Sequence, residues 1–458
     1  MSSPQAPPTA WRDIVRQLGP GLIIAAVIVG SGELIVTPKL GAKIGFTLLW
    51  FIILGCLLKV FVQVELGRFA ISRGRTTLEA LDTLPGPRIR VSWIVWLWLL
   101  MYLALVAQVA GMVGGIAEVF QLAGVALPKT LLGLGTVSVC AVLLVTGRYR
   151  LVERTSTCMV ALFTLCTIIA VGALQWSPYA ISFHHIAEGF SFRLPDNAGV
   201  AFAAFGIIGV GASELIYYPY WCLEKGYARH VGDADGSPEW LTRARGWIRV
   251  MRIDAWVSFV IYTGATVAFY LLGAAVLFGK GMDVDNANMI ETLSLMYRES
   301  FGNWSLGIFL VGAGVVLFST VFGATASNAR LAADALKVFK LVDYSGPEHR
   351  ARVVKTACVI LPFASLLVYA FSESPVTLVF VGAIAQGCML PFLAFAALYF
   401  RFKQTERKLR PGTLWTLLLI LAAAAMMLLG VYQVYENLKP NPAAPLPSPA
   451  ATHATPAP

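Results

Sequence analysis

Long apolar runs alternate with short polar segments along the whole chain. Each run is about 20 residues long, which is the length that a helix needs to cross a bilayer. Because a helix satisfies its own backbone hydrogen bonds in hydrocarbon, we expect an all-α polytopic membrane protein. The runs predict about eleven transmembrane helices, at residues 19–45, 46–70, 92–122, 131–145, 152–174, 199–223, 255–278, 306–332, 353–371, 377–399 and 414–432.

The composition supports this class and excludes an ordinary soluble domain. Of the 458 residues, 57% are hydrophobic and 13% are charged, and the mean hydropathy is +0.72. In soluble domains, charged residues alone make up about a quarter of the chain. The net charge of +10 does not call for a nucleic-acid partner, because the basic residues gather in alternate loops, as they do in membrane proteins.

The basic residues also predict the orientation of the chain. They concentrate after the second, fourth, sixth, eighth and tenth apolar runs, as in Arg73, Arg148, Arg229, Lys337 and Arg407. Loops rich in Lys and Arg stay on the cytoplasmic side. We therefore expect a cytoplasmic N-terminus, an outside C-terminus, and a multi-pass protein of the plasma membrane, which in a bacterium is the inner membrane.

One short motif occurs twice within the apolar runs. The first copy, Gly30–Pro38, reads GSGELIVTP, and the second, Gly211–Pro219, reads GASELIYYP. Gly, Glu, Leu, Ile and Pro recur at the same offsets. A carboxylate is costly in the bilayer and is kept mainly where it faces a cavity or an ion path. Glu33 and Glu214 therefore mark a candidate functional site.

The positions of the two copies predict an inverted repeat. They lie on the first and sixth runs, so the two copies cross the membrane in opposite directions. Interrupted helices at matching positions of two such halves point to the central site of a transporter. One alternative is a pair of kinked helices that pack closely through small residues.

We expect both helices to be broken at the motif. The predicted division of the chain is a cytoplasmic segment at 1–18, five-helix repeats at 19–175 and 196–402, an eleventh helix at 411–434, and a disordered Pro- and Ala-rich tail at 436–458.

Several stretches together resemble the Nramp family of proton-coupled divalent-metal transporters. They are Gly19-Pro20-Gly21, the residues 41–50, 147–153 and 205–209, and Leu390-Pro391-Phe392. The resemblance runs over nearly the whole chain. It implies the LeuT-type fold, with five plus five helices in inverted repeats, broken helices 1 and 6, and a substrate site between them.

The sequence departs from the family at that site. The family's Asp-Pro-Gly-Asn metal motif matches Gly30-Ser31-Gly32-Glu33, and its Met followed by Pro-His matches Ser213, Glu214 and Leu215. The acidic pair that the family uses for proton movement matches Gln108 and Gly111. The resemblance thus implies a substrate site formed by Gly30, Ser31, Gly32, Glu33, Gly211, Ala212, Ser213 and Glu214, with altered ligands.

The altered residues favour a hard cation. Loss of a thioether leaves only oxygen donors, which suit Mg²⁺ or Mn²⁺ more than softer metals. Glu33 and Glu214 are the predicted ligands, directly or through water. Since burial disfavours an ionised carboxylate, either Glu is also a candidate proton carrier for coupled transport.

A small organic cation or an amino acid is the alternative substrate. Tyr217 and Tyr218 follow the second motif, and aromatic rings bind amines through cation–π contacts. These rings also fit a simple packing role. Gln108, Asn328 and Gln386 are further pathway candidates, or interhelical hydrogen-bond partners.

Two charged residues of the second run carry a separate expectation. Lys59 and Glu65 are expected to reach the membrane surface with their long side chains.

Nothing in the sequence indicates an enzyme. No phosphate-binding loop, zinc-protease helix or nucleophile elbow is present, and the seven cysteines form no metal-binding spacing. We expect a secondary active transporter without a cofactor, acting as a monomer, whose partners are the transported ion or solute and the bilayer.

Overall fold

The computed structural model describes residues 4–147, 149–194, 198–284, 288–372 and 374–438. The side chain of Ser31 is also outside the described part, although its backbone is not. The predicted tail, 436–458, lies outside it except for 436–438, which continue the last helix.

Most long helices match the predicted spans closely, but α13 (Pro238–Leu272) begins 17 residues before the predicted run 255–278. The long helices are α2 (Pro20–Ile28), η1 (Val29–Val36) and α3 (Thr37–Ile44), which run on as one span, then α4 (Leu49–Arg73), α6 (Trp93–Leu122), α7 (Lys129–Val145), α8 (Tyr149–Ala173), α10 (Ala198–Phe205) with α11 (Ala212–Glu224), α13 (Pro238–Leu272) with η3 (Gly273–Phe278), α15 (Ser305–Val338), α16 (Pro347–Ser372), α17 (Pro375–Tyr399) with η4 (Phe400–Gln404), and α18 (Thr413–Leu438).

Short elements connect these helices. They are α1 (Trp11–Gln17), α5 (Thr77–Leu81), the two-residue antiparallel strands β1 (Arg88–Ile89) and β2 (Val91–Ser92), η2 (Leu174–Trp176), α9 (Phe183–Gly189), α12 (Tyr227–Val231), α14 (Met289–Phe301) and η5 (Arg407–Leu409).

The structure confirms the all-α membrane architecture. Within the described residues, nine helices are long and apolar enough to cross a membrane, and α7 is a shorter apolar helix. The sixth span is divided into α10 and α11, neither of which is long enough alone. Counted together, the nine helices, α7 and the divided span give the expected eleven.

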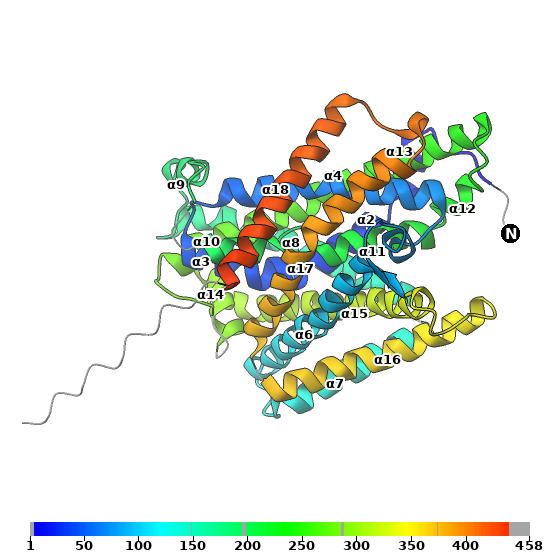
Figure 1. Cartoon of the computed structure of the whole chain (residues 1–458). Helices are drawn as coiled ribbons and strands as arrows, with labels where there is room; N and C mark the ends of the chain where they lie inside the picture. Colours follow the sequence, from blue (N-terminus) through cyan, green and yellow to red (C-terminus); the bar gives the residue numbers. More distant parts are fainter. Residues whose placement is uncertain (1–3, 148, 195–197, 285–287, 373, 439–458) are drawn as a thin grey trace, which may run out of the picture.

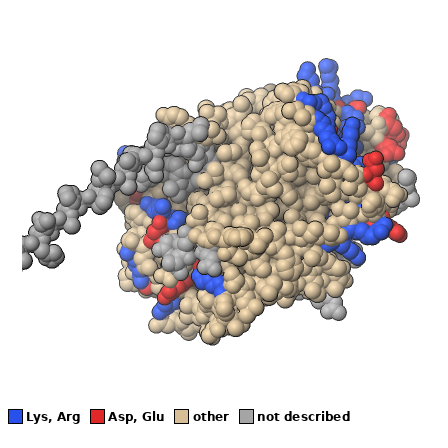
Figure 2. All heavy atoms as spheres, turned by 60° about the horizontal axis from the view of Figure 1, so that its bottom comes forward, with Lys and Arg blue, Asp and Glu red and all other residues tan. Residues whose placement is uncertain are grey.

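The surface is consistent with a bilayer around the middle of the molecule. Figure 2 shows charged residues gathered toward two opposite ends of the visible face, with a broad band of other residues between them. The outer helices place large apolar side chains on this surface, including Val142 on α7, Ile360 on α16 and Leu428 on α18. Such exposure is costly in water but favourable against lipid tails.

The helices form a bundle in which the motif-bearing spans lie at the centre. Figure 1 shows α7 and α16 side by side along one edge and α18 along the opposite edge. Span one packs against α13 and α15, and α11 packs against α2 and α4. In the apolar stretches of span one and of α4, 88% and 72% of the residues are buried inside the protein. In the apolar stretch of α16, only 22% are buried.

The two motif copies adopt different backbones. In span one the motif lies in η1, a π-helix in which the Thr37 N–H donates to the Gly32 carbonyl five residues earlier. This segment is therefore a widened helix rather than an unwound coil, so the expectation that span one is broken at the motif is wrong. Gly30 permits close packing here, because a Cβ at this position would lie 1.9 Å from the Thr320 Oγ1 of α15.

In span six the chain leaves the helix before the motif begins. Residues 206–211 form turns and bends between α10 and α11, and Gly211 is the N-cap of α11. Gly209 has φ +63°, which side chains other than glycine rarely adopt. We refer to residues 206–211 as the span-six break.

Candidate functional site

The span-six break leaves backbone groups without helical partners in the middle of the protein. Such groups are costly in a bilayer unless other groups bind them. In this protein, charged side chains from neighbouring spans do so. The break is therefore the natural starting point for the site.

Lys59 of α4 binds the carbonyl side of the break. Its Nζ donates to the carbonyl of Phe205, the last residue of α10, and to that of Ile208 at 2.7 Å. The ammonium also lies 4.3 Å from the centroid of the Phe205 ring, a cation–π distance. Lys59 and Glu65 are 0% and 2% exposed, so the expectation that both reach the membrane surface is wrong.

Glu33 of η1 binds the amide side of the break. Its Oε1 accepts from the Gly209 N–H at 3.0 Å and from the Thr266 Oγ1 of α13 at 2.7 Å. The other oxygen, Oε2, is buried and has no hydrogen-bond partner among the described residues. Glu33 thus joins span one to the break and keeps one oxygen available for a ligand.

Glu214 lies in the first turn of α11, directly after the break. Its carboxylate lies next to the Ser213 side chain and the backbone of Gly211, and a carboxylate is favourable at this end of a helix. Glu214 is 7% exposed, and its Oε2 also has no partner among the described residues. Glu33, Glu214 and Lys59 lie near enough to interact electrostatically.

A chain of buried hydrogen bonds connects the second motif to two other spans. The Ser213 N–H and Oγ donate to the Gln386 Oε1 of α17 at 3.0 and 2.8 Å. The Gln386 Nε2 then donates to the Gln108 Oε1 of α6 at 2.8 Å. These contacts fix the first turn of α11 against α17 and α6, so the two glutamines position the site.

The two tyrosines after the second motif are held by other spans. The Tyr217 hydroxyl donates to the Asn328 Oδ1 of α15 at 2.7 Å. The Tyr218 hydroxyl donates to the Met251 carbonyl at 2.9 Å and to the Asp254 Oδ2 at 3.1 Å. Both rings are buried, so these contacts fix their orientation.

Asp254 of α13 holds the start of span one. Its Oδ1 accepts from the Gly19 N–H at 2.8 Å and its Oδ2 from the Gly21 N–H at 2.6 Å. The first N–H groups of a helix have no partner within it, and a carboxylate is favourable at that end. Asp254 therefore fixes the entry to α2 and, through Tyr218, connects it to α11.

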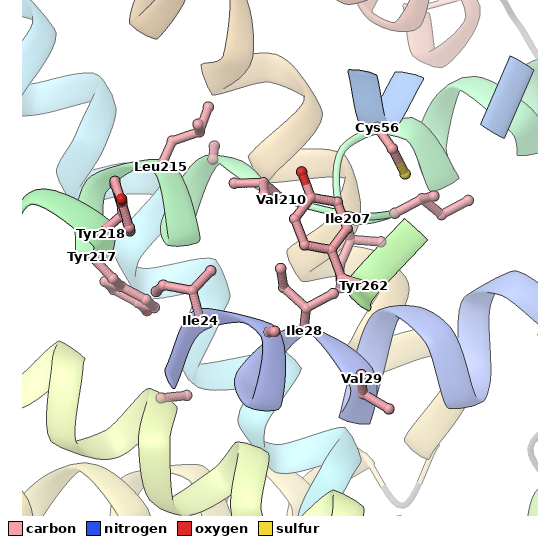
Figure 3. Packing of buried hydrophobic residues seen from close by; sticks show 14 of the residues in the cluster. Ile24, Ile28, Val29, Cys56, Ile207, Val210, Leu215, Tyr217, Tyr218 and Tyr262 are labelled. Carbon is pink, nitrogen blue, oxygen red and sulfur yellow. The ribbon is translucent and has the colours of Figure 1, made fainter. Parts of the chain in front are cut away.

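Apolar side chains surround these polar groups. Figure 3 shows Ile24 and Ile28 of α2 close to the segment that carries Ile207 and Val210, with Cys56 and Tyr262 beside it. All six are less than a tenth exposed. An apolar surrounding strengthens the electrostatic interactions of the charged groups.

The structure brings most of the predicted site residues together. Glu33, Ser213, Glu214 and the backbone of Gly32 and Gly211 lie around the break, and Gln108 and Gln386 support it. Tyr217, Tyr218 and Asn328 lie further along α11 and α15. The Ser31 side chain lies outside the described part of the structure.

Sequence reasoning missed Lys59, Thr266 and Asp254 as parts of this region. A usable signal existed for Lys59, because it lies near the middle of α4, about 15 Å from the helix start at 1.5 Å per residue. A lysine at that depth cannot reach the membrane surface. Thr266 and Asp254 carry no comparable signal in the sequence.

The site contains few side-chain ligands for a metal. Among the described residues, no group of three or more His, Cys, Asp or Glu side chains lies close enough to hold a metal ion. A cation bound between Glu33 and Glu214 would need backbone, hydroxyl or water oxygens to complete its coordination. Mg²⁺ is the ion that most often keeps several waters in protein sites.

Known proteins resemble this chain over most of its length. A family model described as natural resistance-associated macrophage protein-like (Nramp) matches residues 21–436. The divalent metal cation transporter MntH of Mycobacterium tuberculosis is 25% identical over 296 residues, which are 64% of this chain and 64% of that protein. MntH of Bacillus subtilis is 23% identical over 439 residues, 94% of each chain.

Solved transporter structures resemble it in fold. A manganese transporter of Eremococcus coleocola has a TM-score of 0.69 at 15% identity, covering 94% of this chain and 89% of the other. Mhp1, a nucleobase-cation-symport-1 family transporter, has a TM-score of 0.54 at 15% identity, covering 94% and 95%. The architecture is therefore the LeuT-type fold that the sequence predicts.

Proposed function

Because the chain belongs to the Nramp family of membrane transporters, we propose that it is a secondary active transporter of a hard divalent cation such as Mg²⁺ or Mn²⁺. Glu33 and Glu214 bind the ion between spans one and six. The transport cycle is alternating access, in which the two repeats move around this central site.

The observation that carries this proposal is the pair of unpartnered carboxylate oxygens. Glu33 Oε2 and Glu214 Oε2 are buried and have no hydrogen-bond partner among the described residues. By comparison, both oxygens of Asp254 accept backbone N–H groups. Buried carboxylate oxygens without partners are costly, and a cation would satisfy both.

The donor chemistry favours a hard ion. Ser213 offers a hydroxyl where the family has a thioether, and the other donors around the break are carboxylate and backbone oxygens. Oxygen-only sites suit Mg²⁺ and Mn²⁺. The related proteins are named as divalent metal cation or manganese transporters, which supports a divalent cation as substrate here.

Proton coupling belongs to the same proposal. When the ion leaves, the two buried carboxylates repel each other, and a proton bound by one of them relieves this repulsion. Uptake of the ion and release of the proton are then linked at one place. The proposed orientation has a cytoplasmic N-terminus and an outside C-terminus, and the proposed functional unit is a monomer.

Isothermal titration of the purified full-length protein with Mg²⁺, Mn²⁺ and Ca²⁺ tests the substrate. We expect wild type to bind Mg²⁺ or Mn²⁺, and Glu33→Ala and Glu214→Ala each to weaken binding at least tenfold, because each removes a charged ligand. Uptake into proteoliposomes under an imposed pH gradient, with Glu33→Gln and Glu214→Gln, tests the coupling.

Glu188→Gln is the matched control, because Glu188 is exposed and accepts a hydrogen bond from the Thr47 hydroxyl rather than from a group of the break. It should bind the ions as wild type does. Absence of binding for every divalent ion, together with stabilisation by a small amine or amino acid, would show that the substrate is organic instead.

One observation favours that second candidate. The buried ammonium of Lys59 offsets part of the negative charge of Glu33 and Glu214, so the attraction for a divalent cation is weaker than two carboxylates alone would give. A zwitterionic amino acid or a singly charged amine requires less negative charge. The same titrations, repeated with these compounds, separate the two candidates.

A further inference from the structure

The ammonium of Lys59 is unusual among the charged groups that the structure describes. It is fully buried at mid-span, and its hydrogen bonds go to two backbone carbonyls rather than to a carboxylate. Among the described residues it forms no ion pair at contact distance. Glu33 and Glu214 attract it through space, and Cys56 lies one turn away on α4.

The carbonyls that it binds have a particular place in the fold. Phe205 is the last residue of the half-helix α10, and Ile208 lies within the span-six break. The C-terminal end of a helix carries partial negative charge. In transporters with broken helices, such unwound carbonyls and half-helix C-terminal ends coordinate a small cation. Here these oxygens already have a positive partner.

The stem of Lys59 explains how the ammonium gets there. α4 packs against α11, and the Lys59 ammonium reaches the end of α10 beside the Phe205 ring. A four-carbon stem is long enough to span this contact and apolar enough to be buried between these helices. The ammonium is thereby tethered at the break in every protein molecule.

We propose that the Lys59 ammonium is a built-in monovalent cation, occupying the carbonyl site at the span-six break where a free Na⁺ would otherwise bind. The native protein then needs no monovalent cation at this position. A variant without the ammonium acquires a site for a free one. This inference rests on the broken helix and not on the identity of the substrate.

Thermal unfolding of the full-length protein in detergent, in NaCl and in choline chloride at equal ionic strength, tests it. Wild type should unfold at the same temperature in both salts. Lys59→Ala should be less stable than wild type in choline and should regain several degrees in NaCl. Lys59→Arg keeps the charge and should show no difference between the salts.

Lys43→Ala is the control for a lost lysine, because Lys43 is part-exposed and pairs with Asp283 at the protein surface. It should show no sodium effect. A sodium effect in wild type, or a folded Lys59→Ala without one, would overturn the proposal. If Lys59→Ala cannot be purified, Lys59→Met replaces it. If neither neutral variant folds in either salt while Lys59→Arg does, an exchangeable cation site is rejected.

None of these measurements uses a divalent ion. A failed divalent titration therefore leaves the sodium test unaffected, and a negative sodium test leaves the assignment of Glu33 and Glu214 unaffected.

Discussion

The two copies of the GxxELIxxP motif have nearly the same sequence and different backbones. In span one the motif forms the π-helix η1, and the chain remains helical from Pro20 to Ile44. In span six the helix stops at Phe205 and starts again at Ala212. The shared residues therefore do not decide where the helix breaks.

The residues upstream of the motif account for the difference. Gly206 and Gly209 of the break correspond to Ala25 and Ile28 in span one, since the copies are offset by a constant number of residues. Alanine and isoleucine continue a helix, whereas two glycines at these positions weaken it and permit φ +63° at Gly209. Span one thus keeps its own backbone hydrogen bonds.

The two segments therefore differ in how far their backbone groups need side chains from other spans. η1 satisfies its backbone largely by itself and contributes the Glu33 side chain to its neighbour. The span-six break relies on Lys59, Glu33 and, through Glu33, Thr266. Three predictions test whether η1 is stabilised mainly by its own backbone and the span-six break mainly by side chains of other spans.

The largest expected effect comes from crowding η1. In Gly30→Ala the new methyl would lie 1.9 Å from the Thr320 Oγ1, so α15 or η1 must move, at a cost of about 2–3 kcal/mol. Thermal or denaturant unfolding in detergent measures the loss. Adding Thr320→Ala should recover only part of it, because the clash with Oγ1 is removed but the Cβ of residue 320 would still lie 2.5 Å from the new methyl.

Gly135→Ala on α7 is the matched control, since nothing lies within 4 Å of its new methyl. It should be neutral or slightly stabilising. A Gly30→Ala protein as stable as this control would show that η1 does not pack rigidly against α15.

A smaller effect is expected from removing one support of the break. Thr266→Val keeps the shape but deletes the hydroxyl, whose proton is within reach of both the Glu33 Oε1 and the Tyr262 carbonyl of its own helix, each at 2.7 Å. A hydrogen bond to a charged group contributes about 1.5–3 kcal/mol, so we expect a stability loss of about 2 kcal/mol. Thr136→Val, whose hydroxyl bonds only to the Leu132 carbonyl of its own helix, should lose much less.

The smallest effect is expected at the end of η1, where Thr37, the first residue of α3, binds the Gly32 carbonyl. Thr37→Val deletes the hydroxyl bond to the Gly32 carbonyl at 3.0 Å, but this carbonyl also accepts the Thr37 N–H. A neutral hydrogen bond contributes about 1 kcal/mol, and the remaining N–H limits the loss to about 0.5 kcal/mol. Equal losses in Thr37→Val and Thr266→Val, measured by the same unfolding assay, would contradict the proposed difference between the two segments.

The membrane fold was predictable from the sequence because the bilayer constrains it strongly. Hydrocarbon allows few backbone structures, so apolar runs such as 92–122 and 131–145 become the helices Trp93–Leu122 and Lys129–Val145. The sequence also singled out Glu33 and Glu214, because charged residues are rare within a membrane and the GxxELIxxP motif that carries them occurs twice in the sequence.

The partners of those glutamates were decided by tertiary structure. Nothing along the chain joins Glu33 to Gly209, or Ser213 to Gln386 and Gln108, because these contacts depend on how distant spans pack. For Lys59, the sequence shows that the residue lies in an apolar run but not which groups it binds. Its carbonyl partners exist only because α10 ends beside α4, where a break in one span can be satisfied by a charge from another.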